Sequence, residues 1–195
     1  MTMLWRSLWV WLSFRWRGRL GALDTSRLQL RVWPGDIDMN LHMNNGRYFS
    51  VADLGRLDLG LRSAVWLNAL RRGWRPVAGD SDARFSRSLK PFESFELQTR
   101  TLGWDQKWTY CEHRFVREGR VCALVLVRYL FVSKRGPVPP SKVMALSGRE
   151  EQTPTLPDWV LRWSETQDRI SAALKAEAAT AAPAAGETAP RADGA

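Results

Sequence analysis

The chain has 195 residues, enough for one domain with extensions and a substantial core. Its apolar fraction of 45% is ordinary, so nothing in the middle of the chain indicates disorder. Only two histidines and two cysteines are present, which excludes a His-rich zinc site and a disulfide framework. Cys111 and Cys122 lie in strand-like runs and are predicted to be buried free thiols. We therefore expect no metal site.

The net charge of +9 comes from arginines scattered along the chain. There is no zinc-finger spacing, no aromatic signature of RNA-binding domains and no long basic run, which argues against nucleic acid as a partner. An anionic membrane surface or a polyanionic substrate explains the excess at least as well.

Residues 1–24 form a predicted amphipathic segment rich in tryptophan and arginine. Its apolar core, Leu8–Leu12, is too short to cross a bilayer, which takes about 20 residues. Wound as a helix, the segment places its polar side chains on one narrow face: Arg6, Ser13 and Arg17. Tryptophan beside arginine suits the headgroup boundary, so residues 4–17 are interpreted as an interfacial anchor. The alternative is a helix packed on the domain or on a partner subunit.

A signal peptide fits this segment less well, because the charges follow the apolar stretch and no small-residue cleavage site appears. The expected location is cytoplasmic, with peripheral contact at the inner face of a membrane.

The next elements are a strand and two helices. Alternating apolar residues predict a half-buried strand over 26–33. Helical periodicity over Asn45–Leu59 includes Ala52 and Gly55, whose small side chains would let a neighbouring element come close, and Gly60 is expected to end that helix. A shorter helix follows, closed by Gly73.

After Gly73 the apolar period changes to that of strands. Four are predicted, at 82–90, 95–103, 108–118 and 120–133. Glu118-Gly119 predicts a tight hairpin, and the short connections imply antiparallel pairing. The last strand is almost continuously apolar, which favours a central place in the sheet or a dimer seam.

The sequence thus predicts an α+β domain over residues 25–148, in which a curved antiparallel sheet wraps a long central helix. A helical extension is expected over 149–178. Residues 179–195 are rich in alanine and proline and are expected to be disordered.

The most informative stretch is DIDMNLHMNNGRY, from Asp36 to Tyr48, at the start of the predicted central helix. The first backbone N–H groups of a helix lack partners, and the helix dipole places about half a positive charge there. A carbonyl oxygen that becomes an oxyanion is stabilised in such a place. Asn44 or Asn45 can serve as N-cap. Alternate spacing in an extended loop would place three side chains on one side: Asp38, Asn40 and His42.

This string resembles the signature of hotdog-fold thioesterases. It is most similar to plant acyl-carrier-protein thioesterases, and it resembles the 4-hydroxybenzoyl-CoA thioesterase class through the paired aspartates before the helix. HMNNGRYFSVADLGR, LGWDQKWTYCEHRFV and VCALVLVRY also resemble the group around thioesterase superfamily member six. The resemblance covers roughly residues 28–148. It implies a hotdog fold and the hydrolysis of acyl-CoA or acyl-carrier-protein thioesters without a cofactor. It also implies assembly as a homodimer or a dimer of dimers.

The resemblance also implies roles for individual residues. Asp38 matches the aspartate that acts as nucleophile or general base, and the sequence leaves that choice open. Asn40 and His42 match the asparagine and histidine that orient water and stabilise charge. Asp36 is expected to brace the turn, and Asp53 matches an acidic position that supports the site in related enzymes. The counterpart of a further acidic residue of the plant enzymes is not identified.

Coenzyme A carries phosphates, and basic residues spaced along the strand predicted at 82–90 are candidates to bind them. They are Arg84, Arg87 and Lys90.

Two other functions fit the same fold. A non-catalytic binder of acyl thioesters or lipids would have nearly the same sequence. An enoyl thioester hydratase also uses an aspartate and a histidine, but it resembles D-x-N-P-x-H, whereas DMNLH lacks the proline and one residue of spacing. No G-x-S-x-G elbow, P-loop or dinucleotide fingerprint indicates another reaction.

Overall fold

An antiparallel sheet dominates the part of the chain that the computed structural model describes, residues 3–148 and 152–181. The chain divides into two compact units, Met1–Leu156 and Pro157–Ala195. The sheet of the first unit runs in the order β1-β3-β4-β5-β2, and β6 pairs with β5. The strands are β1 (Ser26–Arg31), β2 (Arg75–Phe85), β3 (Ser94–Trp104), β4 (Thr109–Arg117), β5 (Arg120–Ser133) and β6 (Gly136–Val138).

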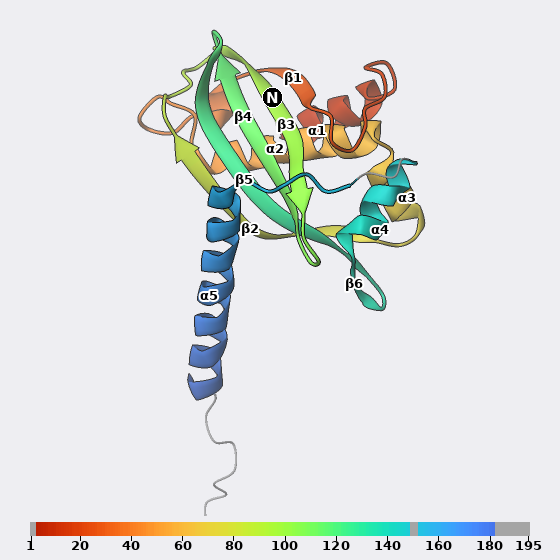
Figure 1. Ribbon diagram of the computed structural model, residues 1–195. Helices are drawn as coiled ribbons and strands as arrows, with labels where there is room; N and C mark the ends of the chain where they lie inside the picture. Colours follow the sequence, from red (N-terminus) through yellow and green to blue (C-terminus); the bar gives the residue numbers. More distant parts are fainter. Residues whose placement is uncertain (1–2, 149–151, 182–195) are drawn as a thin grey trace, which may run out of the picture. The chain divides into compact units, whose positions relative to one another are not determined.

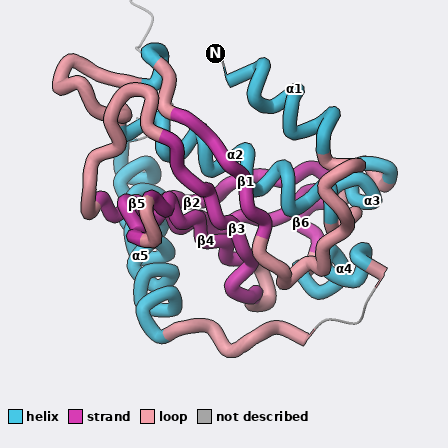
Figure 2. Tube along the Cα trace, turned by 90° about the horizontal axis from the view of Figure 1, so that it is seen from above, coloured by secondary structure: helices cyan, strands magenta, loops and turns pink. Residues whose placement is uncertain are grey.

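Helices accompany this sheet in the first unit (Figures 1 and 2). They are α1 (Met3–Ser13), the 3₁₀ turn η1 (Pro34–Asp36), α2 (Asn45–Arg62), α3 (Val65–Arg71), α4 (Pro140–Met144) and the 3₁₀ turn η2 (Ala145–Ser147). The long helix α2 contacts both edge strands, β1 and β2, as well as the strands between them. The sheet therefore curves around α2, as the sequence predicts.

Helix α2 can pack closely against the sheet because the face that meets the sheet carries small residues. A Cβ added at Gly55 would lie 2.0 Å from Oγ1 of Thr99 on β3, so only glycine permits this approach. The prediction that Gly60 ends the helix is wrong, since α2 continues to Arg62. Gly60 instead makes room for the indole of Trp66, which a Cβ would approach to 2.3 Å. Gly73 does follow the second helix, with φ +72°.

Strand β2 begins at Arg75, earlier than predicted, because Pro76 and Gly79 obscure the strand pattern in its first half, and it also ends earlier than predicted. β2 pairs with β5 alone, and an edge strand tolerates proline. Gly79 lies at a bulge between Ala78 and Asp80, where a Cβ would lie 2.4 Å from the ring of Trp108. β2 ends at Phe85, and the chain continues as a loop.

The hairpin between β4 and β5 turns at Glu118 and Gly119, which both have positive φ, as a two-residue turn of this type requires. β5 pairs with β2 on one side and with β4 and then β6 on the other, so its central position is confirmed. Cys111 on β4 and Cys122 on β5 are buried free thiols, also as predicted.

Helix α1 turns its one charged side chain, Arg6, inward and most of its large apolar side chains outward. Arg6 is 2% exposed and Val10 is fully buried, and α1 packs on α2. The exposed apolar residues are Leu4, Trp5, Leu8, Trp9, Trp11, Leu12 and Trp16. We call this set the outer face of the N-terminal segment. None of the helices within the described residues is long and apolar enough to span a membrane.

The second unit contains one described helix, α5 (Asp158–Ala181). Two ion pairs of i,i+4 spacing support its surface, Arg162–Asp158 at 2.9 Å and Arg169–Glu165 at 2.7 Å. The helix extends three residues into the tail predicted over 179–195. The rest of that tail, 182–195, lies outside the described residues. The domain boundaries inferred from the sequence stay predictions.

Candidate active site

The loop between η1 and α2 is a tight turn, not the extended segment that the sequence suggested. The Asp38 N–H donates to the His42 carbonyl at 3.0 Å, and the Leu41 N–H donates to the Asp38 carbonyl at 3.1 Å. Leu41 adopts φ +57° to close the turn. Ile37 and Met43 form a β-bridge at its base.

The loop delivers its last residue as the cap of α2. The side chain of Asn44 accepts a hydrogen bond from the Gly46 N–H at 2.9 Å, and the Asn44 N–H donates to the Asp36 carbonyl at 2.8 Å. Asn44 is therefore the N-cap, one of the two asparagines expected there. The Asn45 N–H has no acceptor within the described chain. A hydrogen-bond donor is thus available at the positive end of the helix dipole.

One cavity of about 310 Å³ collects the three side chains singled out before the helix. Asp38, Asn40 and His42 all line it, as does Asn45 at the first turn of α2. The remaining wall consists of Met43, Tyr48, Phe85, Ser86, Arg87 and Ser88. The tight turn thus brings Asp38, Asn40 and His42 to one cavity, although an extended loop was expected to do so.

The two aspartates of the motif differ sharply in environment. The Asp36 carboxylate is buried, pairs with Arg6 and accepts the Trp33 N–H at 2.9 Å. The half-buried Asp38 uses only Oδ1, which accepts the Asn40 N–H at 2.9 Å. Its Oδ2, the Asn40 amide and the His42 imidazole have no partner within the described residues. Asp36 is therefore committed to structure, whereas Asp38 keeps an oxygen free for chemistry.

Tyr48 forms the apolar side of the cavity. Its ring is 2% exposed and packs edge-on against Phe85 and Phe115, with centroid distances of 5.0 Å and 4.9 Å. Burial raises the pKa of the phenol, and a hydrogen bond with the backbone of Leu89 opposes that shift. The site therefore has one aromatic wall facing a polar turn.

The three basic residues assigned to coenzyme A do not share one strand. Arg84 lies on β2, but Arg87 and Lys90 follow it in the loop, because β2 ends at Phe85. All three are exposed, and only Arg87 lines the cavity with Asp38.

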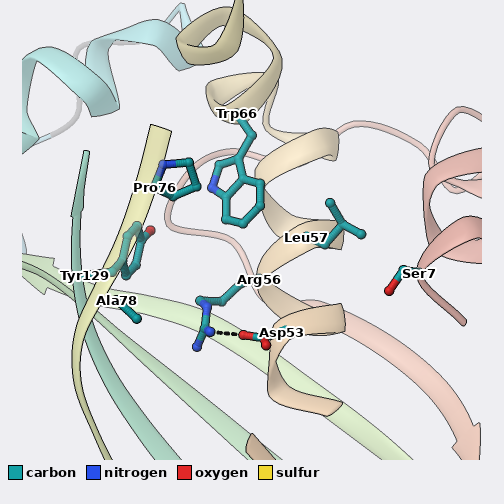
Figure 3. Close-up of a pocket in the computed structure, with 8 residues that line it drawn as sticks. All are labelled: Ser7, Asp53, Arg56, Leu57, Trp66, Pro76, Ala78 and Tyr129. Carbon is teal, nitrogen blue, oxygen red and sulfur yellow. Dashed lines mark hydrogen bonds and ion pairs between the residues drawn. The ribbon is translucent and has the colours of Figure 1, made fainter. Parts of the chain in front are cut away.

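Asp53 faces a second cavity of about 360 Å³, farther along α2 (Figure 3). Its carboxylate is ion-paired with Arg56, one turn farther along α2. The rings of Trp66 and Tyr129 line the same cavity. Desolvation raises the pKa of Asp53, and the Arg56 charge partly offsets that rise. Asp53 does not line the cavity that holds Asp38.

A buried histidine lies behind this second cavity. Arg56 Nη1 lies 3.3 Å from Nε2 of His113, and Thr99 Oγ1 lies 2.9 Å from Nδ1. Because guanidinium only donates, Nε2 is the acceptor, and Nδ1–H donates to Thr99. Burial, helped by the Arg56 charge, lowers the pKa of His113 well below its ordinary value, so the imidazole is neutral. The sequence assigns His113 no role, since its strand pattern marks only an inward-facing position.

Comparisons with known proteins agree with this geometry. Residues 32–164 match the family model of the thioesterase-like superfamily. The protein THEM6 of Xenopus laevis is 34% identical over 148 residues, which cover 75% of this chain and 70% of that protein. The THEM6 protein of Danio rerio is 33% identical over 175 residues, covering 88% of this chain and 85% of the relative.

The fold also matches a solved structure, the probable thioesterase YbaW of Escherichia coli. The TM-score is 0.59 at 15% identity, over 64% of this chain and 96% of that one. A long helix held in a curved antiparallel sheet defines the hotdog fold of this class of protein. The chain belongs to the thioesterase-like superfamily.

Proposed function

We propose that the protein hydrolyses acyl thioesters, carried on coenzyme A or an acyl-carrier protein, to the free acid and the thiol. The observation that carries this proposal is the shared cavity of Asp38, Asn40 and His42 at the N-terminus of α2. Membership of the thioesterase-like superfamily supports it.

In this proposal the thioester carbonyl oxygen is polarised by the free Asn45 N–H and the helix dipole. Asp38 then attacks the carbonyl carbon or removes a proton from an attacking water. Either route breaks the carbon–sulfur bond and consumes one water. Asn40 and His42 orient that water and stabilise developing charge. Arg87 is the basic residue best placed to meet a phosphate of coenzyme A, since it lines the same cavity.

The test is a panel of acyl-CoA and acyl-carrier-protein substrates, with the released thiol as readout. Hydrolysis by the wild-type protein and its loss in Asp38→Asn supports the proposal. Tight acyl-CoA binding without turnover in the wild type would instead make the protein a binder of acyl thioesters.

The assembly that we propose uses β2. This strand is the longer of the two edge strands of the sheet, 11 residues against six in β1, and it is mostly exposed, with Val77 43% and Phe85 42% exposed. Such an edge favours pairing with another strand. Two copies joined through β2 would place Phe85, and hence the Asp38 cavity, beside the seam of a homodimer or of a dimer of dimers. Val77→Asp should lower the mass in solution to that of a monomer. An unchanged mass would contradict assembly through β2.

We also propose peripheral membrane contact through the outer face of the N-terminal segment. Trp5 is 63% and Trp16 83% exposed, and Arg15 and Arg19, on either side of Trp16 in the sequence, are exposed. Exposed tryptophan flanked by arginine matches an anionic lipid surface. Inner-face cytoplasmic location is part of this same proposal.

Sedimentation with phosphatidylglycerol vesicles tests the contact. The triple variant Trp5→Ser, Leu8→Ser, Trp16→Ser should stay in the supernatant, while Val121→Ser, which alters an exposed apolar residue elsewhere, should sediment as the wild type does. Equal sedimentation of both variants would show that the outer face does not bind lipid.

A further inference from the structure

Arg6 is a buried arginine of α1 whose hydrogen bonds to oxygen atoms reach residues 25 to 30 positions farther along the chain. Its Nη1 donates to Asp36 Oδ1 at 3.1 Å, and its Nη2 donates to Asp36 Oδ2 at 2.5 Å. Nη2 also donates to the Arg31 carbonyl at 3.1 Å. The side chains of Arg6 and Asp36 are 2% and 3% exposed. A guanidinium fork thus holds a carboxylate with both oxygens engaged, away from water.

Asp36 in turn closes the base of the loop that carries the candidate catalytic residues. Its N–H donates to the Trp33 carbonyl, and its carbonyl accepts the N–H of Asn44, the N-cap of α2, each at 2.8 Å. One residue separates Asp36 from Asp38. A shift of the Asp36 side chain would therefore move the turn relative to the end of α2.

The same N-terminal segment makes a second ion pair at the opposite end of α2. We call the Arg6–Asp36 pair the first clamp and this pair the second clamp. Arg17 Nη2 lies 2.5 Å from Asp58 Oδ1, and Asp58 also receives Arg62 at 3.3 Å and the Ser26 hydroxyl at 2.5 Å. Asp58 is fully buried, and it lies 13 residues beyond the first residue of α2. The two clamps anchor the same segment, but only the first touches the catalytic loop.

We propose that Arg6 is a positioning residue for hydrolysis. By fixing the Asp36 carboxylate, it holds the turn of Asp38 and His42 at the N-terminus of α2. This inference rests on the proposed function. It makes the N-terminal segment part of the catalytic apparatus as well as a surface element.

Kinetics of matched variants test the proposal. Arg6→Gln should lower kcat by about 10- to 100-fold, because small displacements of a reacting group are costly, while KM changes little. Arg6→Lys, which keeps the charge but loses the fork, should fall between Arg6→Gln and the wild type. The control Arg17→Gln removes the other clamp and should keep kcat within about twofold of the wild type, measured on folded protein well below its Tm. Equal losses of kcat in Arg6→Gln and Arg17→Gln would reduce Arg6 to an anchor of the segment.

Hydrogen exchange provides a readout that needs no activity. Arg6→Gln should speed exchange of the amides in 37–44 more than those in 55–62, and Arg17→Gln should do the reverse. A wild-type protein without turnover, but with this exchange pattern, would overturn the hydrolase and keep the role of Arg6 in ordering the loop. Unchanged exchange in 37–44 in Arg6→Gln would overturn the positioning role itself.

Discussion

Two cavities lie along α2, and they differ in whether their polar side chains have hydrogen-bond or ion-pair partners. In the first, Asp38, Asn40 and His42 keep hydrogen-bonding capacity that no described residue uses. In the second, Asp53 is paired with Arg56, which also reaches His113. Charge and histidine occur in both places. What distinguishes the candidate active site is unused bonding capacity beside a helix N-terminus, not the number of ionisable groups.

The sharpest way to break this comparison is to remove one carboxylate from each cavity. Asp38→Asn keeps the size of the side chain but removes its basicity and nucleophilicity, so kcat should fall at least 10²- to 10⁴-fold. The matched Asp53→Asn should cost less than about tenfold, in keeping with a supporting role. Turnover and acyl-CoA affinity are measured on the same preparations, and affinity should survive in Asp38→Asn. Wild-type turnover in Asp38→Asn would remove this carboxylate from the mechanism.

The packing beneath the second cavity is tested by Gly55→Ala. The added Cβ would lie 2.0 Å from Thr99 Oγ1, the partner of His113, so the free energy of unfolding should fall by about 1–3 kcal/mol. Gly35→Ala, where a Cβ meets nothing within 4 Å, serves as control and should stay within about 0.5 kcal/mol of the wild type. Urea titration measures both. Equal stability of the two variants would contradict the close approach of α2 to β3.

His42→Ala tests whether the open cavity tolerates the loss of its imidazole. An imidazole that orients water or stabilises charge is partly replaceable by solvent, so kcat should fall by about tenfold, less than in Asp38→Asn. Stability should hardly change, since His42 has no side-chain partner among the described residues. A loss as large as that of Asp38→Asn would make His42 an obligatory acid or base.

The paired side of the comparison predicts a pH effect on stability. His113 is neutral when folded because burial lowers its pKa, whereas in the unfolded chain its pKa is near the ordinary value of 6.5. Its contribution is therefore complete above that pH and is lost as the pH falls below it, by about 1 kcal/mol between pH 7.5 and 5.5. Urea unfolding of the wild type and His113→Gln at both pH values measures this difference. A variant with the same pH dependence as the wild type would exclude His113 as its source.

Much of the fold could be predicted because the decisive signals are local. β5 was predicted with its observed limits, since an unbroken apolar run between two turns has few other interpretations. β2 was misplaced because its proline and glycine are explained only by partners distant in sequence: a free edge at Pro76 and the Trp108 ring over Gly79. The prediction that Gly60 ends the helix was wrong because the packing of the Trp66 indole from the next helix, α3, against it leaves no pattern in the sequence.

The site was only partly readable from the sequence. The motif predicted which residues gather at the helix, but it indicated an extended loop where the chain forms a turn closed by Leu41 at positive φ. The polar stripe of the N-terminal segment could also be predicted from the sequence. The partner of Arg6 could not, because its pairing with Asp36 spans 30 residues and depends on how α1 packs. Long-range ion pairs leave no periodic trace in a sequence.

The buried cysteines have a practical consequence for measuring this chemistry. Burial raises the pKa of the Cys111 thiol to about 12 and that of Cys122 above its ordinary value. Disulfide reagents react with thiolates that they can reach, so the folded protein should add almost no background to an assay that counts released coenzyme A. In a control without substrate, consumption of two equivalents of reagent per chain would report unfolding. The assay reagent therefore also checks that each enzyme preparation is folded.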